Sequence, residues 1–195
     1  ADGALIITPY YNKPTQEGLY RHYKAIAESV DLPQVLYNIP GRTGVNMLPS
    51  TVARLCGLQS IVGIKEGSGS VQQASEIAQT CGDRMVVLAG DDALTLPMMA
   101  VGGKGVISVT SNVVPSEMAQ LVKAFLSGRI DEARRIHFAL SPLFTALFYE
   151  TNPIPVKTAL GMMGKIDPEL RLPLCAMATE TKDQLMRVLK DAGLI

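Results

Sequence analysis

The sequence predicts an α/β fold with a parallel sheet, followed by an all-helical C-terminal part. Five short apolar runs with strand character alternate with segments of helical spacing. The strands recur at intervals of roughly 20 to 30 residues, which suits crossover helices between parallel strands and is too long for a meander of hairpins. After Leu126 only helical patterns remain.

Apolar runs and chain breakers place the first three strands and their helices. A helix with Leu19 and Tyr23 on one face follows the first strand, and Thr15 is its expected N-cap. Asp31-Leu32-Pro33 ends this helix. The elements expected in this half are strands at 4–7, 34–38 and 61–66 and helices at 15–30, 49–56 and 70–80.

The second half is expected to complete the sheet and then to continue as helices. Asp92 is the expected N-cap of the helix that follows the fourth strand. Pro115 suits the first turn of the next helix, which reaches Leu126. The elements expected here are strands at 85–89 and 106–109 and helices ending near 100, at 115–126, 130–149, 153–163 and 181–192.

The number of β/α units leaves two architectures open. An eight-fold β/α barrel takes about 250 residues, whereas this chain has 195 residues and five predicted strands. Either the sheet is open, or the first units of a barrel lie outside these residues. The chain opens at Ala1 without methionine and enters a strand almost at once, as expected of a protein entered part-way through.

Composition excludes several classes of partner. With 18 basic and 18 acidic side chains the formal charge is zero, which gives no electrostatic reason to expect nucleic acid or an acidic membrane surface. No apolar run approaches the length of a membrane span, and no signal-peptide pattern opens the chain. The sequence therefore predicts a cytoplasmic protein.

The metal-binding residue types are scattered. Cys56, Cys81 and Cys175 are odd in number and form no C-x-x-C pair, so they are expected to be reduced thiols in the core. His22 and His137 fall in helical patterns without a second ligand nearby. No metal site is expected.

Lys65 lies near the end of the third predicted strand, just before its last residue, Glu66. The turn 67–70, which contains two glycines, follows. This order places the amine at the carboxyl end of a parallel strand, where α/β sheets bind ligands. A desolvated lysine loses its proton readily and then attacks carbonyl groups. For one strand alone, a lysine that extends into solvent is the more common case.

Two further side chains favour chemistry at Lys65. Tyr37 lies near the end of the preceding strand, and consecutive strands of this kind are usually neighbours. The phenol and the amine are therefore expected to lie together at the same end of the sheet. A phenol tuned by such a neighbour can move a proton. Arg42 follows in a turn-rich loop and could hold a substrate carboxylate, although solvated loop arginines are common.

The loops contain two other candidate features. Tyr10 and Tyr11 follow the first strand in a polar loop and suit either a subunit contact or the lining of a site. Gly67-Ser68-Gly69 lacks the third glycine of a dinucleotide fingerprint, but its backbone amides could meet a carboxylate at a helix start.

Several motifs together resemble one family. The chain contains, in family order, P-Y-Y-N-K-P, Y-N-I-P-G-R-T-G, G-I-K-E, G-D-D, G-V-I-S-V-T and N-P-I-P-V-K. These motifs at this spacing resemble the dihydrodipicolinate synthase family, within the class I pyruvate aldolase superfamily that includes N-acetylneuraminate lyase. The likeness covers essentially the whole chain.

The resemblance implies a (β/α)8 TIM barrel, here partial with five β/α units, and a C-terminal helical domain. The partial barrel that carries the lysine would span 1–127 and the helical domain 128–195. The resemblance also implies a cytoplasmic homotetramer, built as a dimer of dimers.

Site residues follow from the same motifs. Lys65 matches the lysine that forms a Schiff base with pyruvate, and Tyr37 matches the proton-relay phenol. Tyr11 matches a tyrosine that reaches across the dimer interface into the partner's site. Arg42 matches the arginine that holds the carboxylate of aspartate semialdehyde, and the backbone of Ile107 matches a pyruvate contact.

The implied reaction is the condensation of pyruvate with L-aspartate 4-semialdehyde to 4-hydroxy-tetrahydrodipicolinate in lysine and diaminopimelate biosynthesis. It implies no metal and no organic cofactor. Tyr10 matches a position near the lysine-feedback site of those members that have one, which makes lysine a possible ligand.

One family feature does not occur in this sequence. The family has a T-T-G-E segment on an earlier strand, so the first three β/α units are expected to lie outside these residues. Two alternatives therefore stay open: another pyruvate-dependent aldolase, acting on N-acetylneuraminate or a keto-deoxy sugar acid, or a non-catalytic barrel fragment. Arg42 and the paired tyrosines favour the synthase.

Overall fold

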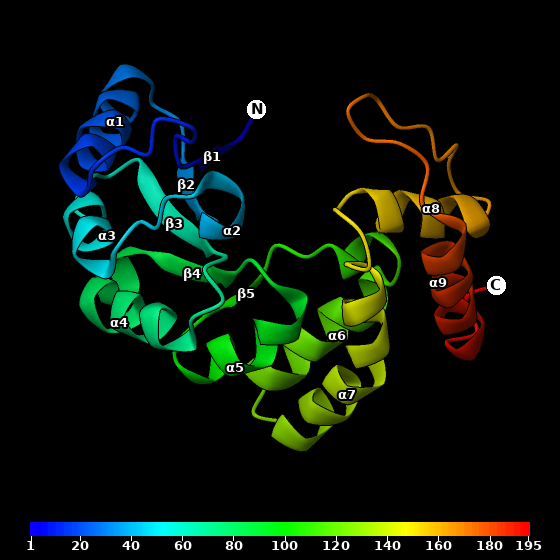
Figure 1. Ribbon diagram of the computed structural model, residues 1–195. Helices are drawn as coiled ribbons and strands as arrows, with labels where there is room; N and C mark the ends of the chain where they lie inside the picture. The colour runs from blue at the N-terminus through cyan, green and yellow to red at the C-terminus, as the bar shows by residue number, and fades with distance from the viewer. The chain divides into compact units, whose positions relative to one another are not determined.

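A parallel sheet organises residues 1–107 in the computed structural model, which describes residues 1–195 (Figure 1). Its strands lie side by side in chain order, and every neighbouring pair is parallel. The strands are β1 Ala4–Ile7, β2 Gln34–Asn38, β3 Ile61–Glu66, β4 Val86–Ala89 and β5 Gly105–Val106. This arrangement confirms the predicted parallel α/β sheet.

Helices cover one side of this sheet (Figure 1). Helix α3 packs against both α1 and α4, and α4 packs against α5. These helices are α1 Gln16–Ser29, α3 Pro49–Leu55, α4 Val71–Cys81 and α5 Thr95–Ala100. Thr15 caps α1 as predicted, since its side chain accepts a hydrogen bond from the backbone N–H of Gly18.

The two faces of the sheet are in different environments, because successive side chains of a strand point to opposite faces. Leu36, Ile64 and Val87 are fully or almost fully buried and belong to the core beneath the helices. Burying one such aliphatic side chain contributes about 1.5–3 kcal/mol. The residues that follow Leu36 and Ile64, which are Tyr37 and Lys65, lie on the other face and are only partly buried.

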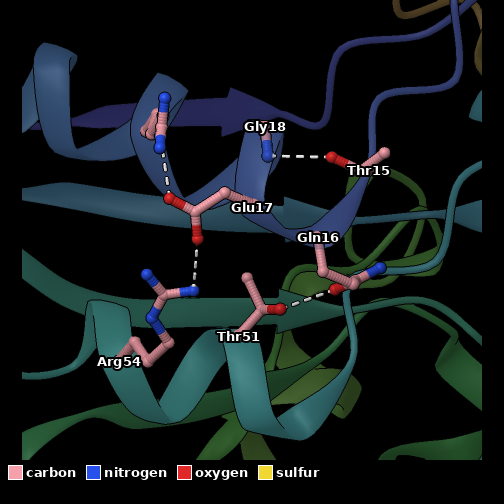
Figure 2. A network of polar contacts seen from close by, with 7 residues as sticks. Thr15, Gln16, Glu17, Gly18, Thr51 and Arg54 are labelled. Carbon is pink, nitrogen blue, oxygen red and sulfur yellow. Dashed lines mark hydrogen bonds and ion pairs between the residues drawn. The ribbon is translucent and has the colours of Figure 1, made fainter.

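A polar network at the start of α1 joins this helix to α3 (Figure 2). Glu17 forms ion pairs of 2.8 Å with Arg21 of its own helix and with Arg54 of α3. The hydrogen bonds from these two guanidinium groups lower the pKa of the Glu17 carboxyl. Beside it, the Oε1 atom of Gln16 accepts a hydrogen bond of 2.6 Å from the Thr51 hydroxyl.

Several predicted elements differ from the structure in extent. Strand β5 has two residues instead of four and begins at Gly105, because it pairs only with Leu88 and Ala89 at the end of β4. The loop expected after β2 contains a short helix, α2 Pro40–Thr43, with Gly44 left-handed at its C-cap. The Pro-Gly pair in this segment favours a turn by its composition, which explains why the helix was not predicted.

The prediction that Asp92 is a helix N-cap was wrong. The cap is Asp91, whose side chain accepts a hydrogen bond of 2.9 Å from the N–H of Ala93. Asp92 is instead the first residue of the 3-10 helix η2, Asp92–Leu94, and is buried. The difference arises because the helical turn begins at Asp92, one residue earlier than predicted, so that Asp91 takes the capping position.

Residues Ser108–Ile195 form a second compact unit, in which all the regular elements are helices. Its helices follow the predicted ones within a few residues. Helix α7 packs against α6 and α9, and α8 also contacts α9. They are α6 Pro115–Leu126, α7 Ile130–Ala146, α8 Ile154–Met162 and α9 Thr179–Asp191. The expected boundary between the barrel and the helical domain, at 127/128, lies within this unit and stays a prediction.

The cysteines differ in their environments. Cys56 and Cys81 are buried, as predicted, whereas Cys175 is exposed, so the prediction of three core thiols was wrong for that residue. Burial raises the pKa of the Cys81 thiol to about 12, and a hydrogen bond with Cys56 adds to this effect. None of the helices combines the length and apolar character required to cross a membrane.

The ends of β3 and β4 approach each other so closely that Gly90 tolerates no side chain. A Cβ atom there would lie 2.9 Å from Cα of Gly67 and 3.0 Å from the carbonyl oxygen of Glu66, and neither backbone atom can move freely. We expect Gly90→Ala to destabilise the fold by about 1–3 kcal/mol, as overpacking does. The shift of the urea midpoint in circular dichroism measures this loss.

Gly41→Ala is the matched control, because nothing lies within 4 Å of a Cβ atom at Gly41. Its effect should stay within about 0.5 kcal/mol, as for ordinary surface substitutions. Equal urea midpoints for the two variants would contradict the close approach of the strand ends.

Candidate functional site

The candidate site lies at the carboxyl ends of β2 and β3. Tyr37 is paired with Lys65 in the parallel register, and Asn38 with Glu66. Tyr37 and Lys65 therefore lie side by side on the sheet face that the helices leave uncovered. The predicted juxtaposition of phenol and amine is present in the structure.

The Lys65 amine lies above the Tyr37 ring. Its Nζ atom is 4.2 Å from the ring centroid, which is within the range of a cation–π contact. Such a contact restricts the four-carbon side chain of a lysine that would otherwise sample many rotamers. The amine thus lies beside a hydroxyl-bearing ring.

The protonation of both groups is shifted by their surroundings. Burial lowers the pKa of the Lys65 amine, the charge of Asp92 opposes this shift and the charge of Arg42 adds to it. Burial raises the pKa of the Tyr37 phenol, and Arg42 acts in the opposite direction. A larger neutral fraction makes Lys65 a better nucleophile, while Tyr37 keeps its proton and can donate it.

Arg42 is placed near both groups by the short helix α2. This helix begins directly after β2, and Arg42 is exposed on it. Its charge acts on Lys65 and on Tyr37, so the guanidinium lies near both groups. An exposed guanidinium beside a reactive amine can receive a carboxylate by bidentate pairing.

Asp92 is a site residue that the sequence-based prediction missed. It follows β4, is 2% exposed, and its negative charge raises the pKa of Lys65 against the effect of burial. The signal was available in the sequence, since Gly90-Asp91-Asp92 follows the next strand at the same edge of the sheet. Asp92 was predicted to cap a helix, and so it was not considered as a neighbour of Lys65.

The structure does not bring Tyr11 to Lys65. Tyr11 is 89% exposed, in the loop after β1, and its neighbour Tyr10 is 65% exposed. The backbone of Tyr11 has φ 63°, and Lys13 in the same loop has φ 49°. For bulky residues this left-handed region is strained, and such strain occurs most often at functional sites.

The backbone of Ile107 extends the pairing of β4 with β5. Its N–H donates a hydrogen bond of 3.0 Å to the carbonyl oxygen of Ala89. Any contact of this backbone with a ligand would therefore use its carbonyl oxygen.

The turn after β3 uses most of its amides internally. The N–H of Ser68 donates to Oε1 of Glu66, and that of Ser70 donates to Oγ of Ser68. Gly67 donates to the carbonyl oxygen of Asn38. These three amides are thus not available to a ligand carboxylate, contrary to the sequence-based suggestion.

No three His, Cys, Asp or Glu side chains come together in a way that could hold a metal ion.

Comparisons with known proteins agree on one family. The family described as Dihydrodipicolinate synthetase matches residues 1–192. A relative named 4-hydroxy-tetrahydrodipicolinate synthase, from Geotalea daltonii, is 60% identical over 195 residues, which cover 100% of this chain and 67% of the relative. The chain thus spans about two thirds of the length of that relative.

Solved structures of the same family have the same fold. Dihydrodipicolinate synthase from Thermotoga maritima matches with a TM-score of 0.98 and 49% identity, over 100% of this chain and 68% of that one. The chloride-inhibited dihydrodipicolinate synthase from Acinetobacter baumannii, solved in complex with pyruvate, matches with a TM-score of 0.97 and 46% identity. The match covers 100% of this chain and 67% of that one.

The lowered pKa of Lys65 can be tested without any substrate. A limited amount of acetic anhydride at a series of pH values modifies only neutral amines, and mass spectrometry of a digest gives the rate for each lysine. We expect Lys65 to become reactive at a pH below the ordinary lysine range of about 10.4. Exposed Lys182 in the same digest serves as the internal comparison. A Lys65 rate that first rises above pH 10.4 would contradict the assignment.

Proposed function

The chain belongs to the dihydrodipicolinate synthetase family, and from this premise we propose that it is a lyase of the class I aldolase type. The proposed reaction condenses pyruvate with L-aspartate 4-semialdehyde to 4-hydroxy-tetrahydrodipicolinate, in lysine and diaminopimelate biosynthesis. One observation carries the proposal: Nζ of the partly buried Lys65 lies 4.2 Å from the centroid of the Tyr37 ring, at the carboxyl ends of adjoining strands.

Lys65 is the nucleophile of the first step. Its neutral amine attacks the ketone carbon of pyruvate, the carbonyl oxygen leaves as water, and an iminium forms. Burial favours this step, because it lowers the pKa of Lys65 and so increases the fraction of neutral amine. A family member solved with pyruvate supports this choice of first substrate.

The iminium then activates the methyl group of pyruvate. Loss of a methyl proton gives an enamine, with the positively charged nitrogen as electron acceptor. The enamine carbon attacks the aldehyde carbon of the second substrate, and the aldehyde oxygen takes up a proton. The amino group of that substrate finally attacks the iminium carbon, which closes the ring and releases the Lys65 amine.

Tyr37 is proposed to carry protons in these steps. Its ring adjoins the Lys65 amine, and its raised pKa keeps the phenol protonated until a base beside it takes the proton. Arg42 is proposed to bind the carboxylate of aspartate semialdehyde, since it is exposed on α2 and its charge acts on Lys65. The carbonyl of Ile107 is proposed as a contact for pyruvate.

Tyr11 is proposed to act in a partner subunit. Its ring is 89% exposed on a strained loop and has no contact with the site of its own chain, as a residue that enters a neighbouring site would be. The corresponding assembly is a homotetramer built as a dimer of dimers. Tyr10 beside it is proposed to adjoin a site for lysine as feedback ligand.

The proposed architecture follows the family. Residues 1–127 are proposed to form five units of a (β/α)8 barrel, and residues 128–195 a helical domain. The parallel sheet and the TM-scores of its structural relatives support this assignment. A cytoplasmic location is proposed from the balanced charge and the biosynthetic reaction.

A covalent adduct tests the proposal directly. Pyruvate with sodium borohydride should reduce the iminium to a stable secondary amine, which mass spectrometry locates on Lys65. Lys65→Ala should abolish the adduct, because no other lysine is held beside the Tyr37 ring. Lys182→Ala, on the exposed surface of α9, should retain it.

The outcome separates the alternatives. Turnover with aspartate semialdehyde supports the synthase, whereas cleavage of N-acetylneuraminate identifies a sugar-acid lyase. A folded chain that gives no adduct at Lys65 would contradict the catalytic proposal and support the alternative of a non-catalytic fragment.

Arg42→Ala should affect the second substrate more than the first. Loss of a charge-assisted contact of about 1.5–3 kcal/mol should raise the KM for aspartate semialdehyde ten- to hundredfold, with a smaller effect on the KM for pyruvate. Steady-state kinetics with each substrate varied in turn measures both values. Arg187→Ala, exposed on α9, is the control. Equal effects on the two KM values would argue against the assigned role.

A further inference from the structure

A buried carboxylate lies one residue beyond Lys65, on the opposite side of the sheet. Glu66 is the last residue of β3 and has no exposed surface. Removal of a carboxylate from water costs several kcal/mol unless hydrogen bonds replace its hydration. The proposed mechanism does not use this group, so its presence beside the nucleophile needs another explanation.

Three groups donate hydrogen bonds to Glu66. The N–H of Ser68 lies 2.6 Å from Oε1, and the side-chain amide of Gln73 lies 3.1 Å from Oε2. The amide of Asn38 contacts both oxygens, at 3.4 and 3.1 Å. An ionised carboxylate has acceptor sites only, and each of these partners is a donor. The surroundings therefore fit a carboxylate and would not fit an amide in its place.

The donors are themselves held by further hydrogen bonds. The Asn46 side chain accepts from Asn38 at 2.8 Å and from Gln73 at 3.1 Å, and it donates to Gln73 at 2.9 Å. The backbone carbonyl oxygen of Asn46 accepts a hydrogen bond of 2.8 Å from the Gln16 side chain. Gln16 in turn accepts a hydrogen bond from the hydroxyl of Thr51 in α3 (Figure 2). The network thus connects β2 and β3 with α1, α3 and α4.

This network acts on the strand ends that carry the chemistry. Tyr37 and Lys65 are paired on one face, and Asn38 and Glu66, the next pair in the register, are hydrogen-bonded on the other. The carbonyl oxygen of Glu66 also accepts a bond of 2.7 Å from the N–H of Gly90, after β4. A shift of β3 against β2 would break these contacts and move the Lys65 amine away from the Tyr37 ring.

From this geometry we propose that Glu66 is a positioning residue for Lys65. Its buried carboxylate, through Asn38, Gln73 and the N–H of Ser68, fixes the end of β3 against β2 and thereby holds the amine in its partly buried position beside the Tyr37 ring. The inference rests on the proposed function and deepens it, since it names the support that the reacting lysine requires.

Glu66→Gln is the decisive substitution, because it keeps the size of the side chain and replaces one acceptor oxygen by a donor. That NH2 group would face donors only, and the strand end should loosen. Glu66→Gln combined with Gln73→Glu exchanges the two groups across their 3.1 Å contact and restores an acceptor to the network. Glu76→Gln is the matched control, because Glu76 accepts from Gln72 at 2.9 Å on the exposed side of α4.

The main readout is the pH dependence of Lys65 acetylation, which needs no substrate. In Glu66→Gln water should reach the amine, so the pH midpoint of the Lys65 rate should rise toward the ordinary lysine range. The double variant should return toward the wild-type midpoint, and Glu76→Gln should not differ from wild type. A residue that only stabilised the fold would change the fraction of folded protein without moving this midpoint.

Activity gives a second readout. Misplacement of the nucleophile should lower kcat about ten- to hundredfold in Glu66→Gln, with little change in KM for pyruvate. Folded Glu66→Gln with the wild-type midpoint and the wild-type kcat would overturn the proposal. So would a midpoint shift of the same size in Glu76→Gln.

A milder variant covers the case in which Glu66→Gln does not fold. Gln73→Met removes one donor and leaves the carboxylate with Asn38 and Ser68, so a smaller rise of the midpoint is expected. An unchanged midpoint in folded Gln73→Met would then overturn the proposal. Failure of the proposed function is recognised separately, because it appears as a wild-type chain that gives no pyruvate adduct, whatever the acetylation midpoints are.

Discussion

The structure depends above all on the register in which β2 and β3 pair. This register places Tyr37 opposite Lys65 and Asn38 opposite Glu66. Because side chains alternate between the two faces of a strand, the first pair lies on the uncovered face and the second beneath the helices. Two adjacent residues of each strand thus serve different purposes, one in the candidate chemistry and the other in the fold.

Burial is the common cause of the shifted pKa values at the site. It lowers the pKa of Lys65 and raises that of Tyr37, so both shifts favour the neutral form. Asp92 and Arg42 then adjust the balance, because their charges act on Lys65 in opposite directions. Both shifts thus act against an ammonium–phenolate ion pair between Lys65 and Tyr37, whose Nζ atom and ring centroid lie 4.2 Å apart.

The sequence predicted what local patterns determine and missed what three-dimensional contacts determine. The strands and the position of Lys65 followed from apolar runs bounded by breakers, and Tyr37 followed from the tendency of consecutive strands to be neighbours. The role of Glu66 could not be predicted, since its donors lie on β2, on α4 and in the turn after β3, and are brought together only by folding. At the cap after β4, two adjacent aspartates were equally suited by residue type, and the sequence did not indicate that the helical turn begins at Asp92 and not after it.

An irregularity at the start of the pairing makes this register possible. Gln34 is paired with Ile61, but Val35 is paired with Gly63, so Val62 is an extra residue in β3. Without the extra residue, Lys65 would lie opposite Asn38 and on the wrong face for Tyr37, because a one-residue slip exchanges the faces of a strand. Bulges are rare between parallel strands and frequent next to active sites, where they redirect a side chain. The extra residue at Val62 therefore sets both pairs at once: it brings the amine to the phenol and the Glu66 carboxylate to its donors.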